Sequence, residues 1–167
     1  MTRIGLLSDT HGYLDDAVLR HFTSVDEIWH AGDVGNPEIL DQLAASKPLR
    51  GVYGNIDGQA VRARFPEANS FLCEEVKVTM LHIAGYPTRY NANAKALILR
   101  EKPQLLIAGH SHILKIMYDR ELEHLHINPG AAGQQGWHQE KTIVRFTIDG
   151  KNIRDCEVIE LGKRGAQ

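Results

Sequence analysis

The chain has 167 residues, of which 43% are hydrophobic and 24% are charged. This balance is typical of one folded globular domain and argues against a disordered chain. The formal net charge of −2 argues against a nucleic-acid partner, because such proteins usually carry a basic surface. Nine histidines stand against 19 lysines and arginines together, and this excess is a reason to look for metal ligands.

Targeting, membrane and disulfide features are missing from the sequence. Apolar runs such as residues 104–108 are far shorter than the roughly 18 residues that a membrane helix needs. The first residues show neither the long apolar stretch nor the cleavage site of a signal peptide. Cys73 and Cys156 lie far apart and outside any C-x-x-C pattern. We therefore expect a cytoplasmic protein without a membrane segment, whose two cysteines are buried, reduced side chains.

The first half of the chain alternates predicted strands and helices. Apolar runs predict strands over residues 3–8, 27–30 and 49–53. A helix capped by Asp15 or Asp16 follows the first strand, and a helix from Pro37 to Leu43 follows the second. This order predicts parallel strands joined by helical crossovers.

The second half is richer in strands. One helix is predicted over residues 91–100, where it stops before Pro103, and a turn at Asp149-Gly150 predicts a closing hairpin. Strands are predicted over residues 71–74, 76–82, 105–108, 113–118, 121–128, 142–148 and 153–161. We expect one α/β domain over residues 1–167, with two sheets packed face to face and helices outside.

Polar side chains follow five of the predicted strands, at the point where each strand ends. They are Asp9, His11, Asp33, Asn55, His82, His110 and His112. Each short motif is weak by itself, but ligands of open α/β sheets gather outside the carboxyl ends of the strands. Carboxylate, imidazole and amide donors without thiolates suit divalent first-row metals, and the set exceeds what one tetrahedral ion needs. Two metals that share a bridging ligand are the simplest interpretation.

The ordered motifs resemble those of the calcineurin-like metallophosphoesterases. They are S-D-T-H-G at 8–12, H-A-G-D at 30–33, G-N-I-D at 54–57, L-H at 81–82 and G-H-S-H at 109–112. The chain length and Asn128-Pro129-Gly130 resemble the small prokaryotic YfcE-type phosphodiesterase group. This resemblance implies a four-layer αββα sandwich of two mixed sheets, with a dinuclear metal centre at the strand ends.

The resemblance also implies ligand roles and a reaction. It places Asp9, His11 and His112 on one metal, Asn55, His82 and His110 on the other, and Asp33 between them. A hydroxide between the ions would attack phosphorus in line with the leaving oxygen, and Asn55 would also contact the substrate. We expect Mn²⁺, although Fe, Co, Ni or Zn would also accept these mixed donors. A phosphodiester is favoured over a monoester, because no arginine cluster flanks the motifs.

Two positions depart from the pattern of the family. Many of its phosphatases carry a histidine after the asparagine, as a proton donor, and here that place is Ile56, followed by Asp57. Asp57 is a candidate proton donor, with a role beside the ligands or in a turn as the alternatives. His82 is followed by Ile83 rather than the more usual glycine. Arg89, with Tyr90 beside it, is a candidate contact for the substrate phosphate, and the alternative is an exposed loop arginine.

The remaining histidines have simpler interpretations. His30 precedes the Ala-Gly-Asp turn and either orients a ligand or packs in the core. Surface or strand-face positions are expected for His21, His124, His126 and His138.

The expected partner is a small phosphoester, with neither a membrane nor nucleic acid, and exposed sheet edges would allow a homodimer. The alternative function is a protein-interaction scaffold of the same fold, with or without metal, like the retromer subunit. All seven ligand positions keep donor side chains, and this favours the enzyme.

Overall fold

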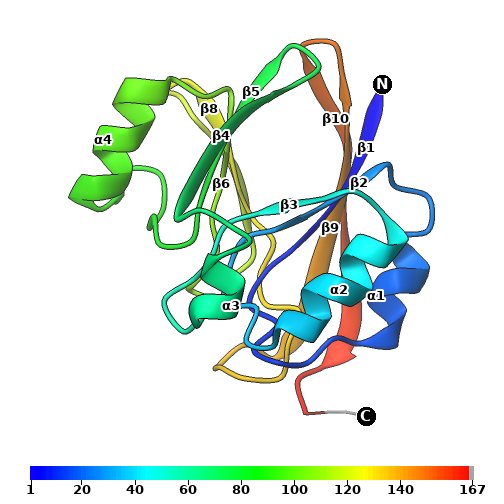
Figure 1. Ribbon diagram of the computed structural model, residues 1–167. Helices are drawn as coiled ribbons and strands as arrows, with labels where there is room; N and C mark the ends of the chain where they lie inside the picture. The colour runs from blue at the N-terminus through cyan, green and yellow to red at the C-terminus, as the bar shows by residue number, and fades with distance from the viewer. Residues whose placement is uncertain (166–167) are drawn as a thin grey trace.

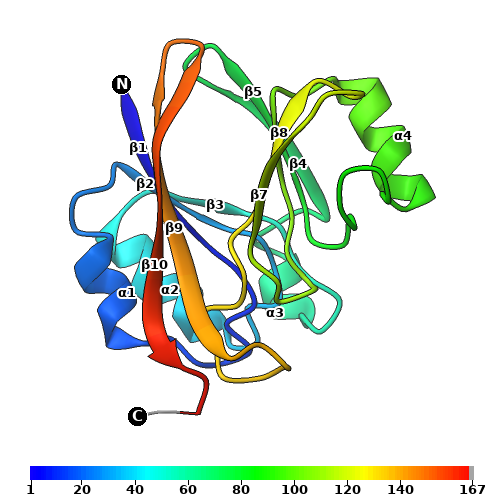
Figure 2. The same ribbon diagram turned by 180° about the vertical axis from the view of Figure 1, so that it is seen from behind.

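A computed structural model describes residues 1–165, which form two five-stranded sheets. The first sheet has the order β10-β9-β1-β2-β3 and the second the order β4-β5-β6-β8-β7. The strands of the first sheet are β1 (Thr2–Leu7), β2 (Glu27–His30), β3 (Leu49–Gly51), β9 (Glu140–Asp149) and β10 (Asn152–Lys163). Those of the second are β4 (Ala68–Cys73), β5 (Val76–Leu81), β6 (Leu105–Ile107), β7 (Lys115–Asp119) and β8 (His124–Asn128). Figures 1 and 2 show the two sheets facing each other.

Helices cover the outer faces of both sheets unequally. The helices α1 (Asp16–His21) and α2 (Pro37–Ser46) pack outside the first sheet, with the short α3 (Gln59–Arg62) beside them. Only α4 (Ala92–Glu101) packs outside the second sheet (Figure 1). The expected four-layer αββα order with two mixed sheets is therefore confirmed. None of the helices in the described residues is both long and apolar enough to cross a membrane.

Side-chain caps explain where the helices begin. Asp15 accepts a hydrogen bond from the backbone N–H of Ala17 at the start of α1. Asn36 caps α2 in the same way, directly before Pro37. Asn91 caps α4, accepting from Ala94 N, and these caps satisfy N–H groups that have no partner within the helix.

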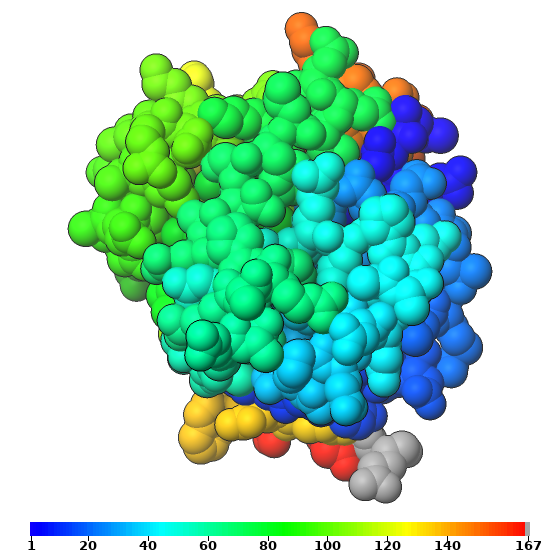
Figure 3. All heavy atoms as spheres, viewed as in Figure 1, coloured from blue at the N-terminus to red at the C-terminus, as the bar shows by residue number. Residues whose placement is uncertain are grey.

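Apolar side chains from both sheets fill the space between them. Trp29 of β2 is fully buried and lies edge-on to Phe71 of β4 and Phe146 of β9, at ring-centroid distances of 5.1 and 5.8 Å. In the space-filling view of Figure 3, side chains occupy the region that looks open between the ribbons of Figure 1. Cys73 is buried as expected, but Cys156 on β10 is exposed, because β10 is an edge strand and its outer positions meet no further layer.

One helix was missed, and several element boundaries differ from the sequence predictions. The helix α3 was not predicted, because four residues are too short to show a helical period. The strand predicted over 49–53 ends at Gly51, and the one predicted from Phe71 begins at Ala68. The strand predicted from Glu121 begins at His124, because Asp119 Oδ1 accepts from the two N–H groups that follow and closes a turn there.

The parallel strands direct their carboxyl ends to one rim of the sandwich. β1 pairs in parallel with β2, and β2 with β3, while β5 pairs in parallel with β6 in the other sheet. The loops that leave these five strands therefore meet at this rim, where residues distant in sequence come together.

Candidate metal centre

The structure brings all seven predicted ligand side chains to this rim. Asp9 and His11 follow β1, Asp33 follows β2, Asn55 follows β3, His82 follows β5, and His110 and His112 follow β6. Two groups of candidate metal ligands result, Asp9 with His11 and His112, and Asp33 with His82 and His110. Within each group the ligand atoms lie within 4.8 Å of one another.

The first group surrounds a buried carboxylate. Asp9 Oδ1 lies 3.2 Å from His112 Nε2 and 3.7 Å from His11 Nε2. The other carboxylate oxygen, Oδ2, accepts hydrogen bonds from Ser8 Oγ at 2.6 Å and from the backbone N–H of His110 at 3.1 Å. Asp9 is thus fixed through one oxygen, while the other faces the imidazoles.

The second group adjoins the amide of Asn55. His82 Nε2 lies 3.1 Å from Asp33 Oδ2, and Asn55 Oδ1 lies 3.1 Å from His110 Nδ1. The same Asp33 oxygen lies 3.3 Å from His11 Nε2 of the first group. Asp33 therefore stands between the two groups, where a bridging carboxylate would have to stand.

Unpaired buried atoms show that these residues fit a metal. Asp9 Oδ1, His11 Nε2 and His82 Nε2 are buried and have no hydrogen-bond partner of good geometry. Buried polar atoms without partners are uncommon, and they mark places where an ion or a water is to be expected. Imidazole nitrogen and carboxylate oxygen are the donors that divalent first-row metals accept.

The electrostatics of the metal-free site are those of buried carboxylates held by imidazoles. The nearby carboxylates of Asp33 and then of Asp9 raise the pKa of His11 to about 9, against the opposing effect of burial. Burial alone would raise the pKa of Asp33, but the nearby imidazoles of His11 and His82 lower it well below its usual range. Burial likewise opposes the lowering of the pKa of Asp9 by His11 and His112. The two carboxylates are therefore ionised and available to a cation.

The orientation of His82 is set by a carbonyl behind it. His82 Nδ1 donates to Ala31 O at 2.7 Å, so the unprotonated Nε2 can face the carboxylates. A hydrogen bond of this kind fixes the tautomer and the ring plane of a ligating histidine.

The backbone at the site is unusual. Ten described residues other than glycine have a positive φ, and five of them are candidate ligands, namely Asp9, His11, Asp33, His110 and His112. Such conformations are unfavourable for residues with a Cβ and tend to gather at functional sites. Their concentration here agrees with loops shaped to aim side chains at one point.

Glycine at position 54 lets the backbone approach Asp33. A Cβ placed on Gly54 would overlap Asp33 Oδ1, whereas one placed on Gly58 meets nothing. Gly54 is therefore required by close approach to the central carboxylate.

His30 positions the loops that carry the candidate ligands. It is fully buried, its Nδ1 accepts from Gly32 N at 3.1 Å, and its Nε2 donates to Thr10 Oγ1 at 3.1 Å. Burial lowers the pKa of His30 to about 4, so the ring is neutral at pH 7. Of the two interpretations offered for His30, both are met in part: it packs in the core and orients the loops that carry Asp9 and Asp33.

Asp57 also holds backbone groups. Its carboxylate accepts from Val34 N at 3.2 Å, Gly35 N at 2.9 Å and Gly54 N at 2.8 Å. These bonds tie the loop after β2 to the loop after β3, which carry Asp33 and Asn55 respectively. Both carboxylate oxygens of Asp57 are therefore engaged by backbone N–H groups.

Two histidines expected at strand faces prove to be fully buried on β8. Both lie under the loop after β5, where the Tyr90 hydroxyl is 2.8 Å from His124 Nε2 and 2.8 Å from His126 Nδ1. Of the two alternatives, a strand-face position is confirmed for both and a surface position is wrong, because α4 and its preceding loop cover this face of the sheet. Tyr90 is held by these rings, and Arg89 is exposed.

The other two histidines are half-buried. His21 lies in the last turn of α1, where its side chain is partly exposed. His138 packs its ring edge-on against His112, 5.3 Å between centroids, and its Nε2 lies 2.8 Å from Gly133 O. His138 therefore supports the ring of a candidate ligand. The sequence could not show this contact, because His138 lies far from the motifs along the chain.

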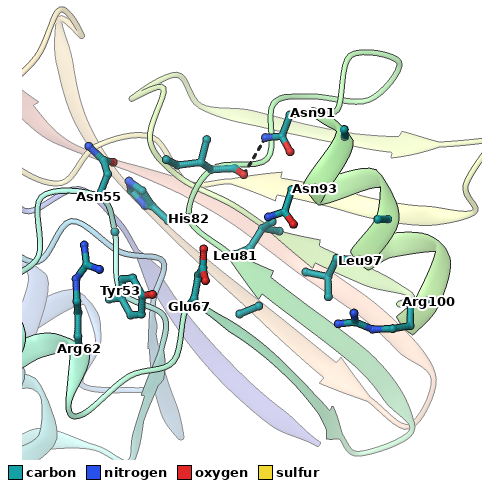
Figure 4. A pocket seen from close by; sticks show the side chains of 15 residues that line it. Tyr53, Asn55, Arg62, Glu67, Leu81, His82, Asn91, Asn93, Leu97 and Arg100 are labelled. Atoms are coloured by element: carbon teal, nitrogen blue, oxygen red, sulfur yellow. Dashed lines mark hydrogen bonds between the residues drawn. The ribbon is translucent and has the colours of Figure 1, made fainter.

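A cavity of about 740 Å³ opens beside Asn55 and His82. Figure 4 shows Arg62 and Glu67 among the side chains that line it. Sequence reasoning missed both, because neither lies in a motif and only the fold places them beside the ligands. Arg89, the candidate phosphate contact, is not among the residues that line this cavity.

Comparison with known proteins agrees with the motifs. Residues 2–151 match the family described as the calcineurin-like phosphoesterase superfamily domain. A probable metallophosphoesterase of Methanothermobacter thermautotrophicus is 33% identical over 165 residues, which cover 95% of this chain and 92% of the relative.

Solved structures share the fold. An archaeal phosphodiesterase has a TM-score of 0.73 at 20% identity, covering 95% of this chain and 99% of that one. Vps29 of Entamoeba histolytica in complex with Zn²⁺ has a TM-score of 0.72 at 16% identity, covering 95% of this chain and 98% of that one. At these identities the likeness concerns the fold alone.

Proposed function

The chain belongs to the calcineurin-like phosphoesterase superfamily, and from this membership we propose that it is a metal-dependent phosphodiesterase with a dinuclear centre. One observation carries the proposal: seven donor side chains from five strand ends converge on buried carboxylate and imidazole atoms that lack partners. We treat residues 1–167 as one metallophosphoesterase domain.

The proposed ligand assignment follows the two groups of side chains. Asp9, His11 and His112 would hold one divalent ion, Asn55, His82 and His110 the other, and Asp33 would bridge them. Mn²⁺ is proposed first, with Fe, Co, Ni or Zn as alternatives. When bound, such ions supply a nucleophilic hydroxide at neutral pH and neutralise charge on the phosphoryl oxygens.

The protein's own part is to hold these groups in place. His30 and Asp57 fix the backbone of the ligand loops, and the carbonyl of Ala31 fixes His82. We propose that Asp57 acts by this positioning rather than as the proton donor, since its two oxygens accept three N–H groups. Asn55, exposed at the mouth of the cavity, would contact the substrate phosphate.

A diester is preferred to a monoester because few cations face the centre. A monoester dianion calls for several cationic clamps, and among the described residues the cationic side chains that line the cavity beside Asn55 are Arg62 and Arg100 alone. Arg89 remains a candidate contact only through movement of its exposed loop.

The test is hydrolysis of bis(4-nitrophenyl) phosphate and of 4-nitrophenyl phosphate after chelation and return of each metal. We expect activity with Mn²⁺, greater on the diester. Asp33→Asn should lower kcat/KM by more than the roughly 10–100-fold typical of an outer-shell change. Asp41→Asn, on the surface of α2, is the matched control and should act like wild type.

Absence of hydrolysis with all five metals between about pH 6 and about pH 10 would refute the enzymatic proposal. The scaffold alternative would gain support if an Asp33→Ala protein lost metal and yet kept its full biological activity.

A further inference from the structure

The cavity beside the metal centre has its own architecture. Its wall begins at Asn55 and His82, and it continues along the start of β4 and along α4 as far as Arg100. In Figure 4 the carboxylate of Glu67 stands between Arg62 on one side and Asn93 on the other. The cavity is thus continuous with the candidate centre and extends away from it.

Its size exceeds what a phosphate group requires. A volume of about 740 Å³ falls in the range of roughly 300–1,000 Å³ that is usual for sites of whole small molecules. A phosphodiester with two small alkyl groups would leave most of this space to water. The cavity therefore has room for an organic group about the size of a nucleoside.

Arg62 is exposed, but two contacts orient its side chain where it lines the cavity. Its Nε donates to the backbone carbonyl of Asp57 at 2.7 Å, and its guanidinium lies 4.4 Å above the ring of Tyr53. Within residues 1–165 no carboxylate forms an ion pair with Arg62. Its charge and remaining N–H groups are therefore available to an anionic or carbonyl oxygen.

Glu67 presents the opposite charge farther along. It follows Pro66 at the start of β4, it is exposed, and it has neither a hydrogen bond nor an ion pair with any residue that the structure describes. Leu81 and Leu97 supply an apolar wall beside it, and the Asn93 amide offers both a donor and an acceptor.

We propose that this cavity binds the nucleoside of a nucleoside phosphodiester, with Glu67 accepting hydrogen bonds from N–H groups of the base. A cationic ester group in the cavity would be repelled by Arg62 and Arg100, and an anionic one would be repelled by Glu67. A plain aryl group would leave Glu67 without a partner. A neutral planar heterocycle satisfies all of these conditions, because its face is apolar and its edge carries donors and acceptors.

This inference rests on the proposed function, since the phosphate of such a diester would have to reach Asn55 and His82. The experiment compares 4-nitrophenyl esters that break the same bond and release the same product. The second ester group is methyl in one substrate, and guanosine or adenosine, through its 5′ oxygen, in the others. Initial rates with the Mn²⁺-loaded protein give kcat/KM for wild type, Glu67→Ala, Glu67→Gln and Glu160→Ala.

We expect wild type to prefer at least one nucleoside ester over the methyl ester by about tenfold or more. Glu67→Ala should lower kcat/KM for that nucleoside ester by roughly 10–100-fold, as for loss of a charged hydrogen-bond partner, and leave the methyl ester within about twofold. For Glu67→Gln, kcat/KM on the nucleoside ester should lie between the values of wild type and Glu67→Ala. Glu160→Ala, an exposed glutamate on the distant strand β10, should match wild type.

Equal kcat/KM for all three esters in wild type, or an equal loss on all of them in Glu67→Ala, would overturn the inference. If no ester is hydrolysed, the proposed function is refuted but the nucleoside site is not. Calorimetric titration with the same esters then tests whether the cavity binds a nucleoside. Binding of a nucleoside ester that weakens in Glu67→Ala supports the nucleoside site, and absence of such binding refutes it.

Discussion

Binding of a divalent ion should release a proton from His11. In the metal-free protein His11 Nε2 lies 3.3 Å from Asp33 Oδ2, and the nearness of this carboxylate and of Asp9 raises the pKa of His11 to about 9. At pH 7 such a group is protonated in roughly 99% of molecules, so deprotonation costs about 100-fold in metal affinity, or ~2.7 kcal/mol. The affinity should therefore rise about tenfold per pH unit from pH 7 and level off above about pH 9.

Calorimetric titration with Mn²⁺ measures this directly. Repeating it in two buffers of different ionisation enthalpy gives the number of protons released, which should be about one or more at pH 7 and should decline toward zero above about pH 9. His21→Ala removes a histidine at the end of α1 and should release the same number. An affinity that is the same at pH 7 and pH 9, with no proton released, would refute the reasoning.

The same pKa shift predicts how stability depends on pH. The folded-state pKa of His11, about 9, lies above the ordinary value of 6.5, so protonated His11 stabilises the metal-free fold. That contribution is complete below about pH 6.5 and is lost as the pH rises through about 9. Burial alone would lower the pKa of His82, but Asp33 and Asp9 together raise it above its usual value, so His82 contributes in the same direction. The urea midpoint of metal-free protein should therefore fall between pH 6.5 and 9, and fall less with Mn²⁺ present.

Three substitutions test the supporting structure. Gly54→Ala should weaken Mn²⁺ binding by roughly 10–100-fold, since its Cβ would overlap Asp33 Oδ1, while Gly58→Ala, where a Cβ meets nothing, should bind normally in the same titration. His30→Ala should lower the free energy of unfolding by about 2–4 kcal/mol, because it empties a buried site and removes two hydrogen bonds; a loss below about 0.5 kcal/mol in urea would contradict this. Tyr90→Phe should destabilise by about 1–3 kcal/mol, because it leaves two buried imidazoles on β8 unpaired, and unchanged urea unfolding would show that they find other partners.

Much of the fold could be predicted from local pattern. Alternating apolar runs and capping residues identified every strand and three of the four helices in residues 1–165. These signals are local, because a strand period or a side-chain cap involves only a few consecutive residues. The helix α3 has only four residues and no side-chain cap, so it left no such signal. Its omission mattered, because α3 carries Arg62 into the cavity.

The candidate ligands could be predicted for a similar reason. Each of the seven stands at the end of a predicted strand or within four residues after it, and parallel strands bring their carboxyl ends to one edge. The sequence could not show which histidines lie beside them. His124 and His126 alternate along β8 like many exposed strand residues, and only α4 with its preceding loop makes them buried.

The sequence by itself determined the order of strands and helices, the strand-end donors and, through their motifs, the family. These depend on neighbouring residues, whose period and spacing are local properties of the chain. Only the tertiary structure decided that Asp57 holds three backbone N–H groups, that His138 supports His112, and that a cavity with an unpaired Glu67 adjoins the centre. These features arise where loops from different strands meet, and their distances are set by the packing of the two sheets rather than by spacing along the chain.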